Sequence, residues 1–111
     1  MVKQGTIIKI NFNPQSGHEQ AGDRLAVVIS NNIFNEKAKL SIVCPITNTN
    51  NNFPLHVSLD SRTKTTGVIL CEYIKALDLN SRTYHVIEDL PKDILQNVID
   101  IVYSEIEQIE D

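Results

Sequence analysis

The sequence predicts a mainly β fold, in which five to six short strands form a small, strongly curved antiparallel sheet or barrel with a C-terminal helix packed on it. Two observations predict this fold. Short apolar or alternating runs separated by polar turns recur over residues 1–87, a pattern that is typical of β-strands. From residue 91 onwards the apolar residues recur at helical spacing instead. The length of 111 residues matches one domain, so we expect a single domain over residues 1–111.

Three strands are expected in the first half of the chain, over residues 5–12, 25–30 and 40–47. The first alternates, whereas the second is a continuous apolar run that fits a strand buried on both faces. In the third strand, Pro45 indicates an edge or a bulge because proline cannot donate to the ladder. Residues 13–24 form a polar loop that is long enough to suggest a function. Residues 31–39 predict a turn or a short helix.

Strand signals in the second half fall at residues 55–59, 67–77 and, more weakly, 84–87. Polar connections over residues 48–52 and 60–66 separate them. The apolar residues of the last segment recur every three to four positions, which predicts an amphipathic helix from Pro91 to Ile109. Pro91 suits the first helical turn, and Asp93 lies where the positive end of the helix dipole favours an acid.

The composition excludes several classes of protein. Apolar residues make up 41% and charged residues 22% of the chain, which rules out wholesale disorder. No apolar run approaches the roughly 20 residues of a membrane span. Cys44 and Cys71 lie in apolar runs without a CxxC partner, so we expect buried thiols in a reducing compartment. The expected protein is soluble and cytoplasmic, without membrane contact.

The charge is unevenly distributed along the chain. Residues 1–82 carry nine Lys and Arg against six Asp and Glu, whereas residues 83–111 carry one Lys against eight acids. This asymmetry indicates an acidic terminal element separate from a mildly basic face. Alternatively, the acids simply solvate the outer face of the helix. The net charge of −4 therefore does not decide whether the ligand is a nucleic acid.

The sequence carries no recognisable metal or cofactor motif. His18, His56 and His85 are far apart, no HxxxH or CxxC pair exists, and the four glycines never cluster into a phosphate-binding loop. Neither cysteine lies in the polar surroundings that a thiolate nucleophile needs. We expect no metal and no cofactor, which leaves the polar loop as the candidate site.

Three sequence blocks resemble one protein family. GHEQAGDR at residues 17–24, directly before an apolar strand, resembles the hallmark segment of the MazF/PemK/Kid toxin endoribonucleases, G-[HS]-E-Q-x-G-x-R-P. VCPIT at residues 43–47 resembles the family's strand ending in Pro-x-Thr. TTGV, continuing into LCEYIKALD up to residue 78, resembles the T-G-V…[DE]-Q-[IP]-[KR]-x-[IL]-D block. The blocks occur in the family's order, and the similarity covers nearly the whole chain.

The resemblance implies an SH3-like, CcdB-like barrel that forms a homodimer and acts as the toxin of a type II toxin-antitoxin system. The implied activity is metal-independent, sequence-specific cleavage of single-stranded mRNA, held in check by a cognate MazE-like antitoxin. Carried over by position, the catalytic arginine and threonine are Arg24 and Thr47. Kid-type members also use a histidine that falls on His18 and an aspartate that falls on Glu72.

The chain departs from the family pattern at three positions. Leu25 replaces the usual proline after the arginine, which affects the stiffness of the loop. Leu70 stands where Kid-type toxins have a second functional arginine, and Tyr73 stands where most members have glutamine. The change at Leu70 shifts the expected chemistry towards Arg24 and Thr47.

These residue types suit RNA cleavage by the neighbouring 2′-hydroxyl. The transition state gathers negative charge on phosphoryl oxygens, which fixed cationic and hydroxyl donors stabilise. Arg24 offers a planar fork for phosphate and Thr47 a further donor. His18 is a candidate acid or base because imidazole titrates near neutrality. Glu72 could accept the 2′-hydroxyl proton, orient Arg24, or merely pair with Lys75.

The expected RNA-binding residues are Gln20, Arg62, Lys64, Tyr73 and Lys75. Arg62 and Lys64 belong to a loop that otherwise reads as a solvated turn. Tyr73 and Phe53 could stack on bases, as aromatic side chains do in RNA-binding proteins, or belong to the core.

Two other functions stay open. One is a CcdB-like, non-enzymatic toxin that binds a protein target such as DNA gyrase. The other is a catalytically inactive member that binds only RNA or an antitoxin, which the changes at Leu70 and Tyr73 allow. Arg24 and Thr47 in their motifs favour the enzyme, since a gyrase-binding toxin does not require them.

Overall fold

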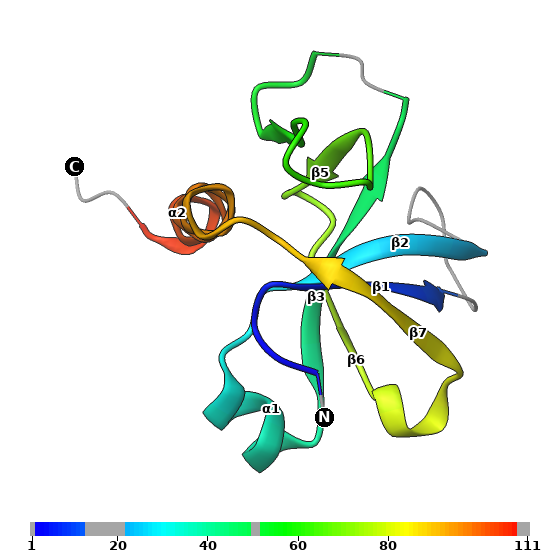
Figure 1. Ribbon diagram of the computed structural model, residues 1–111. Helices are drawn as coiled ribbons and strands as arrows, with labels where there is room; N and C mark the ends of the chain where they lie inside the picture. The colour runs from blue at the N-terminus through cyan, green and yellow to red at the C-terminus, as the bar shows by residue number, and fades with distance from the viewer. Residues whose placement is uncertain (1, 13–21, 50–51, 109–111) are drawn as a thin grey trace.

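The computed structural model describes residues 2–12, 22–49 and 52–108 (Figure 1). Its strands are β1 Thr6–Asn11, β2 Asp23–Val28, β3 Ser41–Thr47, β4 His56–Ser58, β5 Val68–Leu70, β6 Lys75–Leu77 and β7 Tyr84–Asp89. Its helices are α1 Asn32–Ala38 and α2 Lys92–Ile106, and a 3₁₀ turn covers Leu79–Ser81.

All the strands belong to one antiparallel sheet with the order β4-β5-β3-β2-β1-β7, and β6 pairs with β3. The strands cross at steep angles in Figure 1, so the sheet is strongly twisted and curved. Its hydrogen-bonded path ends at β4 on one side and at β7 on the other. In the described part of the chain the sheet is therefore barrel-like without being closed. The predicted fold class, antiparallel β with a C-terminal helix, is confirmed.

The predicted number of strands is wrong, because the described residues form a sheet of seven strands rather than five or six. The apolar run over residues 67–77 is not one strand but two, β5 and β6, with a turn between them. The weak signal at residues 84–87 is the start of a six-residue strand that pairs with β1.

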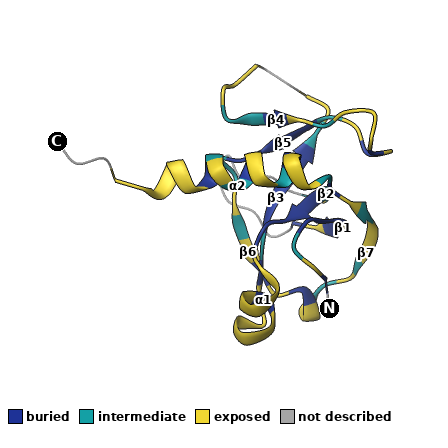
Figure 2. Ribbon diagram, turned by 60° about the vertical axis from the view of Figure 1, so that its left-hand side comes forward, coloured by how far each residue is buried: buried dark blue, intermediate teal, exposed yellow. Residues whose placement is uncertain are grey.

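The core lies on both faces of the sheet. On one face, Val27 and Cys44 pack with Ile94 and Val98 of α2. Their strand neighbours point to the other face, where Ala26 joins a second cluster around β1 and the 3₁₀ turn. Figure 2 shows α2 exposed on its outer side, with buried strands beneath it. The helix therefore covers one face of the sheet, whereas the residues of the other face belong to the second core cluster.

Pro45 lies in the middle of the sheet rather than at an edge. It pairs with Ala26 of β2 on one side. On its other side, β3 pairs with β6 through Ser41–Val43 and with β5 from Ile46 onwards, so Pro45 faces the break between these two partners. A residue without an N–H fits this break, because no ladder hydrogen bond is lost there.

Both helices fall where the sequence predicts them. α1 begins after Asn31, whose side chain accepts a hydrogen bond from the Phe34 amide at 2.8 Å, and ends at Lys39 in the left-handed conformation. α2 ends at Ile106, because Glu107 is extended, whereas the predicted helix ran to a residue outside the described ranges. No helix among the described residues is long and apolar enough to cross a membrane.

Candidate active site

The strand register brings Arg24 and Thr47 together at the ends of two neighbouring strands. Leu25 of β2 pairs with Ile46 of β3, and the same register continued by one residue sets Arg24 opposite Thr47. Side chains opposite each other on paired strands point to the same face and have Cβ atoms roughly 5 Å apart. Both residues are half-buried. By alternation they lie on the face that α2 does not cover.

The threonine hydroxyl is held by a local turn. Thr47 Oγ1 accepts a hydrogen bond from the Thr49 amide at 3.1 Å. A hydroxyl that accepts from the backbone still has its own hydrogen to donate. The Thr47 hydroxyl can therefore donate a hydrogen bond to an anion at the end of β3.

The backbone conformation and the close surroundings of Gly67 account for the glycine in the TTGV block. Its φ of +113° is a conformation that favours glycine, and a Cβ there would lie 2.3 Å from the Thr47 carbonyl oxygen. Beside it, the Thr66 hydroxyl donates to Asn48 Oδ1 at 2.9 Å. The hairpin before β5 is thus pressed against the end of β3 and fixes the position of Thr47.

Glu72 lies in the turn between β5 and β6. Moving three residues along β3, from Ile46 to Val43, corresponds to six residues on the partner side, from Ile69 to Lys75. Three extra residues are therefore inserted in the turn, as in a wide bulge, and they direct Glu72 out of the ladder.

The partner of Glu72 is a histidine to which the sequence assigns no role. His56 Nε2 lies 2.9 Å from Glu72 Oε2. The side chains are 7% and 25% exposed, respectively. The alternation of residues 55–59 places His56 on the face opposite buried Val57, and this was the only sequence signal for it. The contact itself joins residues 16 positions apart, which periodicity does not reveal.

The other expected site residues lie in three places. Lys75 of β6 is half-buried opposite Val43, and Tyr73 is half-buried in the turn that carries Glu72. His18 and Gln20 lie outside the described residues.

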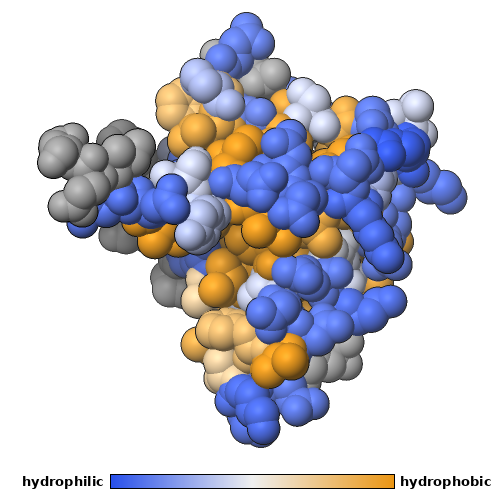
Figure 3. All heavy atoms as spheres, turned by 90° about the vertical axis from the view of Figure 1, so that its left-hand side faces the viewer, coloured by the Kyte–Doolittle hydropathy of each residue, from blue (hydrophilic) through white to orange (hydrophobic). Residues whose placement is uncertain are grey.

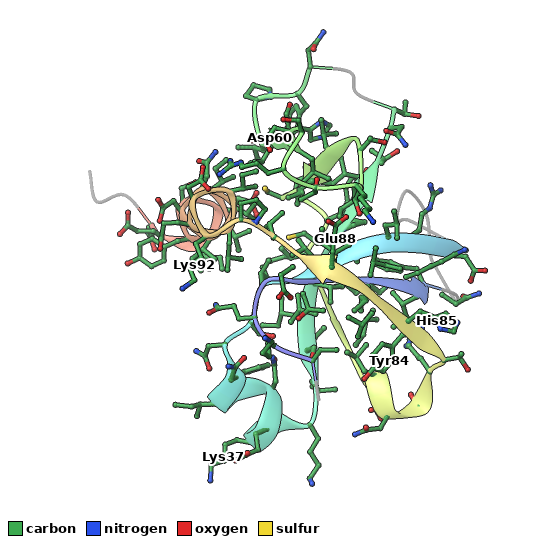
Figure 4. All side chains as sticks on the ribbon, in the orientation of Figure 1. Lys37, Asp60, Tyr84, His85, Glu88 and Lys92 are labelled. Atoms are coloured by element: carbon green, nitrogen blue, oxygen red, sulfur yellow. The ribbon has the colours of Figure 1, made fainter. Side chains whose placement is uncertain are left out.

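Arg62 and Lys64 lie in a loop that is tied to α2 and β7. The Arg62 guanidinium donates to Asp93 at 2.8 and 2.9 Å and to Asp60 at 2.8, 3.1 and 3.2 Å. These hydrogen bonds hold the pKa of both aspartates below the usual range. Glu88 accepts from the Lys64 and Thr65 amides and from the Thr65 hydroxyl. Figure 4 shows Asp60 in the loop and Glu88 on β7.

The two cysteines are core residues, as predicted. Both are free and buried. Burial raises the pKa of the Cys44 thiol strongly and that of Cys71 to about 12. Thiols in such surroundings stay protonated and unreactive. Among the described residues, no group of three or more His, Cys, Asp or Glu could hold a metal ion.

The chain is similar to known proteins over most of its length. The sequence profile of the PemK-like, MazF-like toxins of type II toxin-antitoxin systems matches residues 3–104. Endoribonuclease PemK of Escherichia coli is 30% identical over 102 residues, which cover 88% of this chain and 77% of PemK.

The solved structures show the same fold. A crystal structure of MazF from Deinococcus radiodurans has a TM-score of 0.87 at 33% identity and covers 94% of each chain. A MazE-MazF structure from the same organism has a TM-score of 0.80 at 33% identity over the same shares. The chain therefore belongs to the PemK-like, MazF-like toxins of type II toxin-antitoxin systems, and the predicted resemblance is confirmed.

Proposed function

We propose that this single-domain chain is a cytoplasmic toxin that cleaves single-stranded mRNA at specific sequences without a metal ion. The 2′-hydroxyl attacks the adjacent phosphorus, which gives 2′,3′-cyclic phosphate and 5′-hydroxyl ends. The activity class, endoribonuclease, follows from the family and from relatives such as PemK. The observation that supports the finer proposal is the β2–β3 register, which, continued by one residue, sets Arg24 opposite Thr47 at two strand ends.

Arg24 and Thr47 supply what the transition state needs. A guanidinium can bind two phosphoryl oxygens at once, and a hydroxyl adds a third donor as negative charge develops. Arginine stays protonated at any working pH, so its role is charge stabilisation rather than proton removal. Because Gly67 fixes the end of β3, the threonine donor is in place before the substrate arrives.

Two groups are candidates for moving the proton. Glu72 can take it from the 2′-hydroxyl, and His18 can act as an acid or a base. Tyr73 and Lys75, which follow Glu72 in the chain, are proposed to bind the RNA together with Gln20.

The loop with Arg62 and Lys64 has a structural role in this proposal. The Arg62 guanidinium is already bonded to two carboxylates, so binding a phosphate would mean giving up those partners. The Thr65 amide donates a hydrogen bond to Glu88, and this bond holds the loop behind Thr47 against β7. The ion pairs of Arg62 therefore favour the interpretation of this loop as a tethered turn over its interpretation as a phosphate contact.

The proposed partners are single-stranded mRNA, a second copy of the chain and a MazE-like antitoxin. RNA would run over the face that carries Arg24 and Thr47, away from the acidic helix α2, since phosphate is repelled by carboxylates. Beside α2 lies an apolar groove with exposed Ile74, Tyr103 and Ile106. Figure 3 shows hydrophobic surface on both sides of a hydrophilic band across this side of the molecule. Such a surface suits burial in a homodimer.

The test is incubation of the purified protein with a long single-stranded RNA in EDTA, followed by analysis of the product ends. Fragments with 5′-hydroxyl ends and cyclic or 3′-phosphate ends are expected. Fragments with 5′-phosphate ends, or activity abolished by the chelator, would refute the mechanism. Intact RNA would favour the inactive, binding-only member that the changes at Leu70 and Tyr73 allow.

A further inference from the structure

The pair His56–Glu72 joins the edge strand β4 to the turn after β5. His56 pairs with Leu70 across the β4–β5 ladder, and Glu72 follows Leu70 by two residues. Diagonal neighbours of this kind are within reach of long side chains. The inserted turn thus brings a carboxylate against a histidine that no sequence motif links to it.

The imidazole Nε2 of His56 lies 2.9 Å from Glu72 Oε2. An ionised carboxylate only accepts, so a Glu72 that takes up a proton requires the tautomer in which Nε2 carries the hydrogen and donates. The Phe53 ring packs edge-on against the imidazole at 5.5 Å between centroids. With only 7% of its side chain exposed, His56 holds one orientation and imposes it on Glu72.

The second carboxylate oxygen has no such donor. Glu72 Oε1 is buried without a hydrogen-bond partner among the described residues. A buried acceptor without a donor is costly, and such atoms are uncommon outside functional sites. The side chain of Glu72 keeps 25% of its surface exposed.

We propose that His56 is a positioning residue for RNA cleavage, which holds Glu72 as the group that accepts the 2′-hydroxyl proton. This inference rests on the proposed function. It assigns the proton to Glu72 rather than leaving it between Glu72 and His18. It also gives a role to a histidine outside the sequence blocks that identify the family.

The chemical step balances as follows. The 2′ oxygen forms a bond to phosphorus, and its proton passes to the Glu72 carboxylate. The bond from phosphorus to the 5′ oxygen breaks, and its electron pair leaves on that oxygen, which takes a proton from water. Glu72 then returns its proton to the solvent. His56 keeps its own hydrogen throughout and stabilises the negative charge on Glu72 before the transfer.

Other ionisable groups surround the pair. Burial and, to a smaller extent, the nearby charge of Glu72 raise the pKa of Glu105 in α2. Cys71 and Cys44 lie near the same charges but stay protonated.

The experiment compares His56→Ala and His56→Gln with the wild type on RNA whose cleavage site has first been mapped. His56→Ala is expected to lower kcat roughly ten- to a hundredfold with little change in KM, since accurate proton transfer contributes about 10²–10⁴ in rate. His56→Gln should regain much of the rate, because its amide can donate to Glu72. His85→Ala, which removes an exposed imidazole on β7, is the matched control and should cleave normally.

Two further measurements distinguish a positioning role of His56 from a purely structural role. Added to Glu72→Gln, the change His56→Ala should cause no further loss. An RNA with sulfur in place of the 5′ bridging oxygen has a leaving group that needs no proton, so its cleavage by His56→Ala should stay slow. Restored cleavage of that substrate, or full activity of a folded His56→Ala, would overturn the proposal. A wild type that leaves RNA intact would instead refute the proposed function on which the proposal rests.

Discussion

Two arginines of this chain carry the same guanidinium in opposite settings. Arg24 is half-buried on a central strand, where the register sets it beside Thr47. Arg62 lies in an exposed loop, where Asp60 and Asp93 both accept its hydrogen bonds. A guanidinium bonded to two carboxylates has little left for a phosphate. The comparison teaches that Arg62, although it lies in a basic segment, is held by two carboxylates, and the proposal therefore assigns the phosphate to Arg24.

The largest expected effect is that of Arg24→Ala. Loss of one preorganised donor to a developing oxyanion lowers the rate by about 10²–10³, so cleavage of a long RNA should fall by that factor. Arg24→Lys should also be poor, because an ammonium lacks the planar fork. Lys37→Ala, which removes an exposed charge on α1, is the control. Wild-type rates for Arg24→Ala would show that cleavage does not depend on Arg24 and would refute its proposed role.

The second effect tests the support behind Thr47. Gly67→Ala is expected to destabilise the fold and to reduce cleavage, because its Cβ would collide with the Thr47 carbonyl. Gly22→Ala is the matched control for stability: its φ of +76° is also left-handed, but nothing lies within 4 Å of an added Cβ. It should cost only the conformational strain, about 1–2 kcal/mol. Urea unfolding measures the difference, and equal losses would contradict the collision.

A third prediction concerns acid. Hydrogen bonds from Arg62 lower the pKa of Asp60 and Asp93, and those from Thr65 lower the pKa of Glu88. Carboxyls whose pKa is depressed in the folded state stabilise it above their unfolded values, about 4, and lose this contribution as the pH falls through the folded pKa.

The measurement is urea unfolding of the wild type and Arg62→Ala between pH 3 and 7. Stability of the wild type should fall below about pH 4, and Arg62→Ala should show a shallower fall. Glu105, whose pKa is raised, contributes in the opposite direction in both proteins. Identical slopes would show that the Arg62 ion pairs do not form in solution.

The smallest effect is that of Arg62→Ala on cleavage. Exposed ion pairs contribute only about 0–1 kcal/mol, and this arginine has no proposed contact with RNA. We expect a rate within about twofold of the wild type, measured at neutral pH where the fold is stable. A loss as large as that of Arg24→Ala would restore Arg62 as a phosphate contact.

Local patterns predict much of this fold because periodicity reports which face of an element is buried. The break between β5 and β6 escaped prediction, since it depends on β3 pairing with two different strands. Arg24 and Thr47 were found through motifs, and the β2–β3 register explains their proximity. His56, the partner of Glu72, and Asp93, the more distant partner of Arg62, are 16 and 31 residues away, so only the tertiary fold reveals them.

The central claim is that Arg24 and Thr47 act together on one phosphate, and a double-mutant cycle tests it most directly. It requires kcat/KM of the wild type, Arg24→Ala, Thr47→Ala and the double variant on the same RNA. Groups that act as a unit are strongly non-additive, so the double variant should lose far less than the product of the two single losses. Losses that multiply fully, or a Thr47→Ala variant that cleaves normally, would contradict the account.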